Sequence, residues 1–306
     1  MESFMRILLT GGAASGKSTF AKQLAAGLTA PHYFVDTMYP YFEENSLEAL
    51  RQQEQRNPEG FLTVSCPRKL SSIQFPGKGT ILLECLCNLT ANEMFDEHGN
   101  VRDVYEDLLR DILRLENQCD HLIVVTNEIG CDPQSFLDHT PKYIQMLGKL
   151  NTALAGRFDC VCEMVSGIAL VRKGSLPSHT ETVKGDDSMI LILGGVSSGK
   201  RAYAESLGFA PDQMSDSLED DKPVLYDLQN IIASDPEHCM ELLKPLAKKK
   251  VIICNEVGCG VIPANAKDRD ARLQTGRLCV LLARRARKVV RMMCGIPLVL
   301  KEDTQV

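Results

Sequence analysis

Short apolar runs alternate along the chain with longer stretches in which apolar residues recur at helical spacing. Such alternation is typical of a parallel sheet whose strands are joined by helices that cover its faces. The pattern therefore predicts an α/β fold, a mainly parallel sheet flanked by helices, and predicts it twice. The expected strands lie at residues 6–10, 33–37, 80–84, 121–126 and 159–165, and then at 189–193, 224–227, 249–254 and 288–294.

The interval between the two series of strands differs from both in composition. Residues 174–188 are polar and contain glycine and proline, which is typical of a linker. A chain of 306 residues is long enough for about two domains, each with a core of its own. We therefore expect a complete first domain at 1–173, a linker at 174–188, and a shortened second copy at 189–306.

A repeat within the sequence supports two copies of one plan. The segment IVVTNEIGC at 123–131 matches IICNEVGC at 252–259, and Asn127 corresponds to Asn255. The same constant offset joins Gly148 to Gly276, Ala155 to Ala283, Gly167 to Gly295, Leu170 to Leu298 and Lys173 to Lys301. The glycine-rich loops described next, which begin at Gly11 and Gly194, have a larger offset. The second copy therefore lacks a long stretch of chain between its loop and its Asn-Glu segment.

A phosphate-binding loop follows the first predicted strand. Residues 11–18 read GGAASGKS, which fits G-x-x-x-x-G-K-[ST] between a strand and a helix. In such P-loop (RecA-like) folds the backbone N–H groups cradle phosphates, the lysine neutralises them, and the hydroxyl holds Mg²⁺. We expect the nucleotide to be bound by Gly11, Gly12, Ala13, Ala14, Ser15, Gly16, Lys17, Ser18 and Thr19, with Asp36 and Thr37 at the end of the next strand.

The second loop departs from the motif at one position. Residues 194–200 read GGVSSGK, but Arg201 stands where the serine or threonine should be. The second copy has therefore lost the metal-binding hydroxyl and gained a cation in its place. Two alternatives remain for it: a loop that keeps only the shape, or one that still binds nucleotide through its backbone.

The metal site of the first copy needs a second oxygen ligand. Glu84 ends the apolar run 80–84, and an acidic strand end can reach a Mg²⁺ ion that Ser18 holds. We expect Lys17 and Glu84 to be the catalytic residues and Ser18 and Glu84 to be the metal ligands. The alternative is that Glu84 is an ordinary exposed carboxylate. Asp227 is its expected counterpart in the second copy.

Charge and cysteine content restrict the classes of function. A net charge of −6 gives no electrostatic reason to expect nucleic acid or an anionic membrane as partner. No apolar run approaches the ~18 residues of a membrane span. Of the twelve cysteines, several lie inside apolar runs and none forms a C-x-x-C pair, so we expect buried thiols in a reducing cytoplasm.

Taken together, these motifs resemble the bifunctional adenosylcobinamide kinase / adenosylcobinamide-phosphate guanylyltransferase family of cobalamin biosynthesis. The family opens with a segment like ILVTGGxxSGKSxxAE, and this chain has ILLTGGAASGKSTFAK and ILILGGVSSGKRAYAE. The family's TNEVGxGIVP is matched by TNEIGCDPQ and CNEVGCGVIP. Its AGRVNQxLA segment is similar to LGKLNTALAGR and TGRLCVLLARR. The resemblance covers most of residues 5–173 and 189–302.

The resemblance implies two reactions. A kinase step moves the γ-phosphate of ATP or GTP to a hydroxyl of adenosylcobinamide, and a guanylyl step passes GMP through a histidine to that phosphate. The family's histidine lies in a segment like RIxxHxxxRP, where this chain has LRQQEQRNP at residues 50–58. Gln53 or its neighbour Gln52 takes the histidine's place, and an amide offers no nucleophilic ring nitrogen.

Three hypotheses for the function follow. The first is a Mg²⁺-dependent adenosylcobinamide kinase whose guanylyl step is lost. The second is a non-catalytic homologue that binds nucleotide or corrinoid, and the third is a P-loop kinase of another small molecule. The resemblance also implies a homo-oligomer, with the second copy acting as an internal neighbour of the first.

Overall fold

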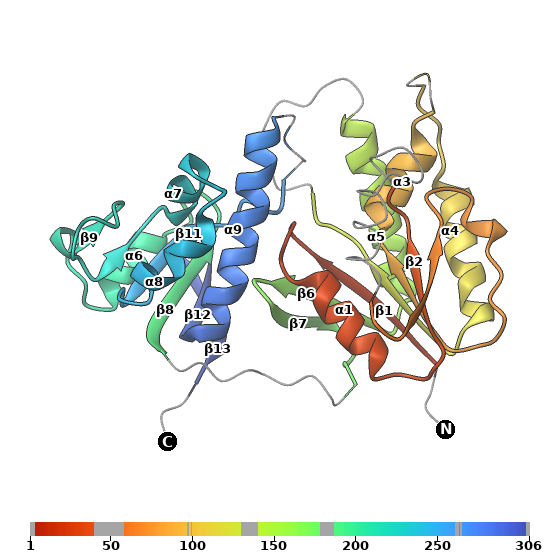
Figure 1. Ribbon diagram of the computed structural model, residues 1–306, viewed down its shortest axis with the longest axis horizontal. Helices are drawn as coiled ribbons and strands as arrows, with labels where there is room; N and C mark the ends of the chain where they lie inside the picture. Colours follow the sequence, from red (N-terminus) through yellow and green to blue (C-terminus); the bar gives the residue numbers. More distant parts are fainter. Residues whose placement is uncertain are drawn as a thin grey trace. The chain divides into compact units, whose positions relative to one another are not determined.

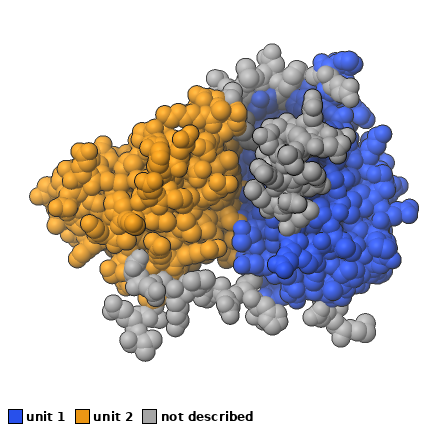
Figure 2. All heavy atoms as spheres, in the orientation of Figure 1, with its two compact units in different colours: residues 1–10, 17–163, 171–180 blue, residues 11–16, 164–170, 181–306 orange. Residues whose placement is uncertain are grey.

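The computed structural model describes residues 4–39, 58–96, 98, 100–129, 140–177, 187–260, 263 and 265–303. Contacts between residues divide the chain into two compact units (Figure 2). Unit 1 contains Met1–Thr10, Lys17–Glu163 and Val171–Thr180. Unit 2 contains Gly11–Gly16, Met164–Leu170 and Glu181–Val306, and therefore includes the first glycine-rich loop as well as the second copy.

The first sheet has the strand order β3-β2-β4-β5-β1-β6-β7 in the described part of the chain. The pairs β1–β5, β4–β5, β2–β4 and β2–β3 are all parallel, so their carboxyl ends lie at one edge. The register sets Asp36 beside Glu84 at that edge. The strands are β1 (Met5–Gly11), β2 (His32–Asp36), β3 (Phe61–Ser65), β4 (Thr80–Glu84), β5 (His121–Val125), β6 (Cys160–Val165) and β7 (Ile168–Lys173).

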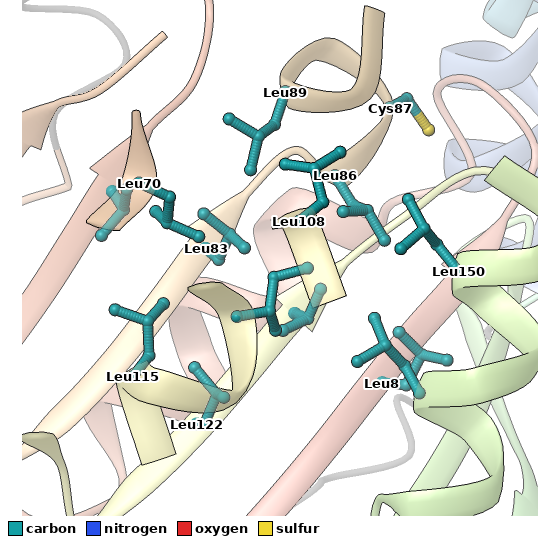
Figure 3. Packing of buried hydrophobic residues seen from close by; sticks show 14 of the residues in the cluster. Leu8, Leu70, Leu83, Leu86, Cys87, Leu89, Leu108, Leu115, Leu122 and Leu150 are labelled. Carbon is teal, nitrogen blue, oxygen red and sulfur yellow. The ribbon is translucent and has the colours of Figure 1, made fainter. Parts of the chain in front are cut away.

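The connecting helices cover this sheet on both faces (Figure 1). They are α1 (Lys17–Ala26), α3 (Leu86–Met94), α4 (Tyr105–Leu115) and α5 (Thr140–Arg157), with the short 3-10 helices η1 (Leu70–Ser72) and η2 (Glu116–Gln118). Helix α1 packs on β4 and β5, while α5 packs against both α3 and α4. Figure 3 shows Leu8, Leu83 and Leu122 of the strands meeting leucines of the helices in one buried cluster. This apolar layer fixes the strand ends that carry the candidate site.

The second sheet lies in unit 2 and has the order β13-β12-β8-β11-β10-β9. Strand β8 is parallel to β11 and β12, whereas β12 and β13 are antiparallel. The strands are β8 (Asp187–Gly194), β9 (Met214–Ser215), β10 (Val224–Leu225), β11 (Val251–Asn255), β12 (Ala286–Met293) and β13 (Ile296–Glu302). The helices are α6 (Lys200–Ser206), α7 (Leu228–Ser234), α8 (Leu243–Leu246) and α9 (Ala266–Arg285), with 3-10 helices η3 (Pro211–Gln213) and η4 (Cys239–Leu242).

The two sheets follow the same plan. Read as β9-β10-β11-β8-β12-β13, the second sheet repeats the order β2-β4-β5-β1-β6-β7 of the first, with no counterpart of β3 among the residues that the structure describes. The predicted α/β P-loop fold, present twice, is therefore confirmed. No described helix is long and apolar enough to cross a membrane.

Some elements differ from those that the sequence predicts. The expected strand 224–227 is shorter, because β10 ends at Leu225 and Asp227 takes a left-handed conformation with φ 53° before α7. Strands β3, β7, β9 and β13 were not predicted. Strand β9 has only two residues, and β7 and β13 each follow the preceding strand after a two-residue turn, which a pattern of alternating strands and helices does not indicate.

Candidate functional site

The two glycine-rich loops have the same backbone conformation. In the first, Gly11, Ala14 and Gly16 have φ values of 141°, 53° and 93°. In the second, Gly194, Ser197 and Gly199 have φ values of 147°, 57° and 93°. Positive φ at these positions turns successive N–H groups toward one point, which is how such a loop cradles an anion. The backbone of a phosphate-binding loop is thus present in both copies.

Lys17 and Ser18 begin α1 directly after the first loop. Lys17 is buried, and the hydroxyl of Ser18 donates a hydrogen bond of 2.5 Å to Oε1 of Glu84 at the end of β4. Parallel pairing explains this meeting, since β4 lies two strands from β1 and its end faces the start of α1. The structure brings together the lysine, the hydroxyl and the carboxylate that the sequence selects.

One of the two carboxyl oxygens of Glu84 has no hydrogen-bond partner among the described residues. Its Oε2 is buried and accepts no hydrogen bond from any residue that the structure describes. Burial raises the pKa of this carboxyl, and the negative charge of Asp36 adds to the rise. The hydrogen bond from Ser18 and the positive charges of Lys17 and Lys22 act in the opposite direction and lower the pKa. A buried carboxylate oxygen beside a hydroxyl is a suitable ligand pair for a small hard cation.

A divalent cation bound by Ser18 and Glu84 would take most of its remaining ligands from water and phosphate and not from protein side chains. The described residues contain no group of three or more His, Cys, Asp and Glu side chains arranged around one point. That is compatible with Mg²⁺, because in phosphoryl-transfer sites it is held by one or two protein oxygens, by water and by the phosphates. Ser18 and Glu84 are therefore the residues that could hold it.

Thr37 and Asp36 follow β2 and have different roles in the structure. The carboxylate of Asp36 accepts a hydrogen bond from the Met38 N–H at 3.0 Å. Thr37 is fully buried, and its hydroxyl donates to the Cys85 carbonyl at 2.8 Å and accepts from the Cys85 N–H at 2.7 Å. The Thr37 side chain thus fixes the backbone just after Glu84. Its main-chain N–H donates to the Glu84 carbonyl at 2.9 Å, and its carbonyl accepts from Asn92 at 2.8 Å.

Replacing Thr37 with valine is expected to destabilise the fold. Valine has nearly the same shape, but it leaves the Cys85 N–H without its acceptor in a buried place. We expect a loss of about 1–3 kcal/mol in the free energy of unfolding. Urea denaturation followed by circular dichroism measures it, with Thr152→Val on the exposed side of α5 as the control. An unchanged midpoint would show that water or a shift of the backbone replaces the hydroxyl.

Two asparagines that the sequence analysis did not select also hold this edge together. Asn92 in α3 donates to the carbonyl oxygens of Thr37 and Pro67 at 2.8 and 2.9 Å. Asn151 in α5 accepts from the Thr126 hydroxyl at 2.8 Å and donates to the Asn127 carbonyl at 3.2 Å. Asn151 belongs to the segment LGKLNTALAGR, which resembles the family, and that is the signal that could have singled it out.

The Asn-Glu pair shared by the two copies is partly structural. The Asn127 N–H donates to the thiol sulfur of Cys87 at 3.1 Å, so this residue ties the end of β5 to α3. The side chain of Glu128 is exposed. In the second copy Glu256 forms an ion pair of 2.9 Å with Arg291.

The charged side chains of the second loop have partners within the protein. Nζ of Lys200 donates to the carbonyl oxygens of Gly194, at 3.3 Å, and of Gly195, so the lysine is turned back onto its loop. Arg201 donates to Oδ2 of Asp227 at 3.1 Å and lies 3.8 Å from the ring centre of Tyr226. A guanidinium therefore meets the second copy's carboxylate in the way that the Ser18 hydroxyl meets Glu84.

The segment in which Gln52 and Gln53 replace the expected histidine lies outside the described residues. Histidines elsewhere in the described chain have other settings. His32 and His121 begin β2 and β5, at the sheet edge opposite Asp36 and Glu84. His238 is exposed and paired with Asp235 at 3.0 Å.

Comparison with known proteins gives one clear family. The model of the cobinamide kinase / cobinamide phosphate guanyltransferase family matches residues 7–171 and 213–300. These two segments include the first loop, Glu84 and both Asn-Glu segments, and together they make up well over half of the chain.

Individual relatives agree with that match. The bifunctional adenosylcobalamin biosynthesis protein CobU of Salmonella typhimurium is 25% identical over 182 residues, which are 54% of this chain and 98% of that protein. The protein of the same name from Escherichia coli is 26% identical with the same coverage. The protein CobP of Pseudomonas aeruginosa is 26% identical over 174 residues, which are 56% of this chain and 98% of that protein.

Among solved structures, an ATPase of the type III secretion system of pathogenic bacteria aligns over 91% of this chain and 80% of its own. Its TM-score of 0.33 and identity of 9% are too low to carry an argument. The family model covers more than half of the chain, and the complete loop with its Ser18–Glu84 pair lies within the match. The chain therefore belongs to the cobinamide kinase / cobinamide phosphate guanyltransferase family.

Proposed function

We propose that the first copy is a nucleotide-dependent adenosylcobinamide kinase of cobalamin biosynthesis or salvage, and that the chain has lost the family's guanylyltransferase step. In this proposal the catalytic copy spans residues 1–173, residues 174–188 are a linker, and residues 189–306 are a shortened copy without kinase activity. The observation that carries it is the contrast between the two loops. Ser18 reaches Glu84 in the first, whereas Arg201 occupies Asp227 in the second.

The reaction would transfer the γ-phosphate of ATP or GTP to the hydroxyl of the corrinoid's aminopropanol arm. The bond between the γ-phosphorus and the bridging β-γ oxygen breaks, a bond to the corrinoid oxygen forms, and the hydroxyl proton is released. The loop N–H groups from Gly11 to Gly16 bind the phosphates, and Lys17 offsets the charge that develops on them. Mg²⁺, when bound, neutralises the β- and γ-phosphate oxygens, and Ser18 and Glu84 would hold it there.

A corrinoid kinase, a kinase of another small molecule and a non-catalytic homologue would give different products in a transfer assay. Incubation with adenosylcobinamide, Mg²⁺ and γ-labelled ATP or GTP should give labelled adenosylcobinamide phosphate, and comparison of the two nucleotides gives the preferred donor. Label on another alcohol but none on the corrinoid would support a kinase of a different small molecule. Binding of nucleotide and corrinoid with no transfer to any acceptor would support the non-catalytic homologue.

Nucleotide affinity should depend on the lysine of the first copy and not on that of the second. Lys17→Ala removes a charge-assisted contact with phosphate, so we expect a loss of about 1.5–3 kcal/mol, or roughly 10- to 150-fold in Kd. Lys200→Ala should change Kd by less than about twofold, because Arg201 stands in place of the metal-binding hydroxyl and is ion-paired with Asp227.

Isothermal titration calorimetry with ATP or GTP in the presence of Mg²⁺ measures both variants. The two lysines are equally buried, so they form a matched pair. Equal losses in the two variants, or a stoichiometry of two nucleotides per chain that Lys200→Ala reduces to one, would contradict the division of roles between the copies.

A further inference from the structure

Glu128 lies at the edge of the first sheet at which Glu84 meets the start of α1. Its strand, β5, lies between β4, which ends at Glu84, and β1, which leads into the first loop. The register sets Val125 of β5 beside both Leu9 and Glu84. Glu128 follows Val125 by three residues, so its backbone reaches at most about 10 Å beyond the level of Glu84. It therefore stands one strand from Glu84 and farther out along the strand direction.

The residues on either side of Glu128 are fixed to the protein. The N–H of Asn127 donates to the Cys87 sulfur at 3.1 Å, and the Asn127 carbonyl accepts from Asn151 at 3.2 Å. Ile129 is 7% exposed and belongs to the hydrophobic cluster of the first copy. Between these two anchors the side chain of Glu128 is exposed. The carboxylate is thus carried by an ordered backbone and faces solvent.

The Glu128 carboxylate forms no hydrogen bond or ion pair within the part of the chain that the structure describes. A strand-end carboxylate of this kind can serve a ligand without first breaking an internal contact. The same residue in the second copy has a different setting, and the comparison shows what distinguishes the first copy.

The second copy contains the equivalent glutamate but neutralises it. Glu256 corresponds to Glu128 at the offset of the repeat. It forms an ion pair of 2.9 Å with Arg291 of β12, in which the two side chains are only 17% and 16% exposed. Arg291 corresponds to Glu163 of β6, which pairs with Arg172 at 2.6 Å. The first copy therefore has a carboxylate at the position from which Arg291 holds Glu256.

Both acidic side chains at this edge of the second copy are thus bound to arginine. Asp227 pairs with Arg201 at 3.1 Å, as Glu256 pairs with Arg291. In the first copy Glu84 accepts the Ser18 hydroxyl instead, and Glu128 faces solvent. The copy with the complete loop is the one in which neither carboxylate is bound to an arginine of the described chain.

We infer that Glu128 is a catalytic residue of the kinase proposed above, and that its carboxylate accepts the proton of the acceptor hydroxyl during transfer. This inference rests on the proposed function. The bond from the acceptor oxygen to the γ-phosphorus forms, and the bond from the γ-phosphorus to the bridging oxygen breaks. That electron pair stays on the nucleoside diphosphate, and the hydroxyl proton moves to Glu128, which passes it to water after the product leaves.

The place of Glu128 suits this step. The attacking and leaving oxygens lie roughly in line on opposite sides of the γ-phosphorus, so the acceptor must approach from beyond the groups that hold the phosphates and the metal. Lys17, Ser18 and Glu84 are those groups, and Glu128 lies farther out on the neighbouring strand. A carboxylate that accepts the hydroxyl proton of the acceptor is the arrangement that protein kinases use.

Asp36 is the other acidic residue that the register places beside Glu84. Its side chain is 9% exposed, and its carboxylate accepts a hydrogen bond from the Met38 N–H at 3.0 Å. It also belongs to β2, which lies on the side of β4 away from β5 and β1. Glu128 has the open carboxylate and the nearer strand, so it is the stronger choice for the proton acceptor.

Glu128→Gln tests the role, because an amide keeps the shape of the side chain but cannot take up the proton. Single-turnover transfer from γ-labelled ATP or GTP to saturating adenosylcobinamide should fall by about 10²–10⁴-fold. The calorimetric Kd for nucleotide and the Mg²⁺ concentration for half-maximal rate should change by less than about twofold. Glu256→Gln in the second copy and Glu106→Gln on the exposed side of α4 are the controls, and both should transfer at the unmodified rate.

A more acidic acceptor separates proton transfer from a structural effect. An adenosylcobinamide analogue with a fluorinated aminopropanol arm has a hydroxyl of lower pKa, so its transfer depends less on a proton acceptor. The loss caused by Glu128→Gln should therefore be at least about tenfold smaller with the analogue than with adenosylcobinamide. A variant that only displaced the backbone would slow transfer to both acceptors equally.

Three results would overturn the inference. Transfer to adenosylcobinamide at the unmodified rate by Glu128→Gln would do so and would leave the proposed kinase standing. An equal loss with both acceptors would show that Glu128 acts on the structure and not on the proton. No transfer to either corrinoid by the unmodified chain would contradict the proposed function itself, and this role would fall with it.

Discussion

Glu84→Gln is expected to lower phosphoryl transfer by on the order of 10²–10³-fold while nucleotide affinity changes by only a few-fold. The amide keeps the shape of the side chain and can still accept the Ser18 hydrogen bond. It removes the negative charge at the buried Oε2, the oxygen that has no partner among the described residues. If that oxygen is a Mg²⁺ ligand, the loss falls on the transition state, where the metal neutralises developing charge.

Ser18→Ala should also lower the rate of phosphoryl transfer, but for a different reason. It removes the second oxygen ligand and also frees Glu84, so the concentration of Mg²⁺ needed for half-maximal activity should rise. Single-turnover transfer from γ-labelled ATP to adenosylcobinamide, measured over a Mg²⁺ series, separates the metal requirement from the limiting rate. Calorimetry on the same variants gives the affinity for nucleotide.

The second copy provides the matched controls. The register of the two sheets places Asp227 one position beyond the counterpart of Glu84, level with Cys85, so the expected correspondence is off by one residue. Arg201 corresponds to Ser18, and it forms an ion pair with Asp227 instead of a metal site. Asp227→Asn and Arg201→Ala should therefore leave both the transfer rate and the Mg²⁺ requirement unchanged. Full transfer by Glu84→Gln and Ser18→Ala would show that the metal is held elsewhere, and a loss in the second-copy variants would show that the copies share the chemistry.

Sequence reasoning was most successful where one physical signal decides the outcome. Five-residue apolar runs bounded by turns can hardly be anything but buried strands, and β4 and β5 begin where predicted. The loop follows from its glycines, because only particular φ values let the chain turn there. Parallel pairing then places Glu84 near the start of α1, and this explains why Ser18 and Glu84 could be selected together from the sequence.

What the sequence could not supply is the direction of side chains. Thr37 reads as a polar residue at a strand end, but its hydroxyl turns inward to the Cys85 backbone. Arg201 reads as a cation in place of a hydroxyl, and the structure shows that it turns to Asp227. Such choices depend on which partner lies nearest in space, and a periodic pattern carries no information about that.

The hairpins at the ends of both sheets were missed for a related reason. An α/β pattern predicts that each strand is followed by a helix, whereas β6 and β12 are followed directly by β7 and β13. The turn residues Ser166-Gly167 and Cys294-Gly295 are the local signal for a tight hairpin, since both positions adopt positive φ. A glycine after a small or polar residue between two apolar runs was the evidence available in the sequence.

Loss of the guanylyl step is the second large effect that we expect. The family passes GMP through a histidine, and this chain has Gln52 and Gln53 where that histidine should be. An amide nitrogen has no free lone pair for attack on the α-phosphorus, so it cannot form the phosphoramidate. The corresponding segment of the second copy falls within the stretch that this copy lacks between its loop and its Asn-Glu segment.

His32 and His121 are poor substitutes for that histidine. His32 begins β2, with Nε2 3.0 Å from the Leu28 carbonyl, and a strand of this length separates it by about 13 Å from Asp36 at the site edge. His121 is buried at the start of β5, and its Nε2 lies 3.1 Å from the Thr29 hydroxyl. In-line attack needs a nucleophile about 3–3.5 Å from phosphorus.

We therefore expect no covalent GMP on the unmodified protein. Incubation with α-labelled GTP and Mg²⁺, followed by denaturation, should leave no acid-labile, base-stable label on the chain, while γ-label from the same nucleotide still reaches adenosylcobinamide. A guanylylating member of the family is the positive control, because it should retain the label under identical conditions. Gln53→His tests whether the lost nucleophile is the only missing part: label on this variant alone would locate the defect at that position. Stoichiometric adduct on the unmodified chain, mapped by mass spectrometry, would instead mean that another histidine has taken over the attack and that both reactions of the family survive here.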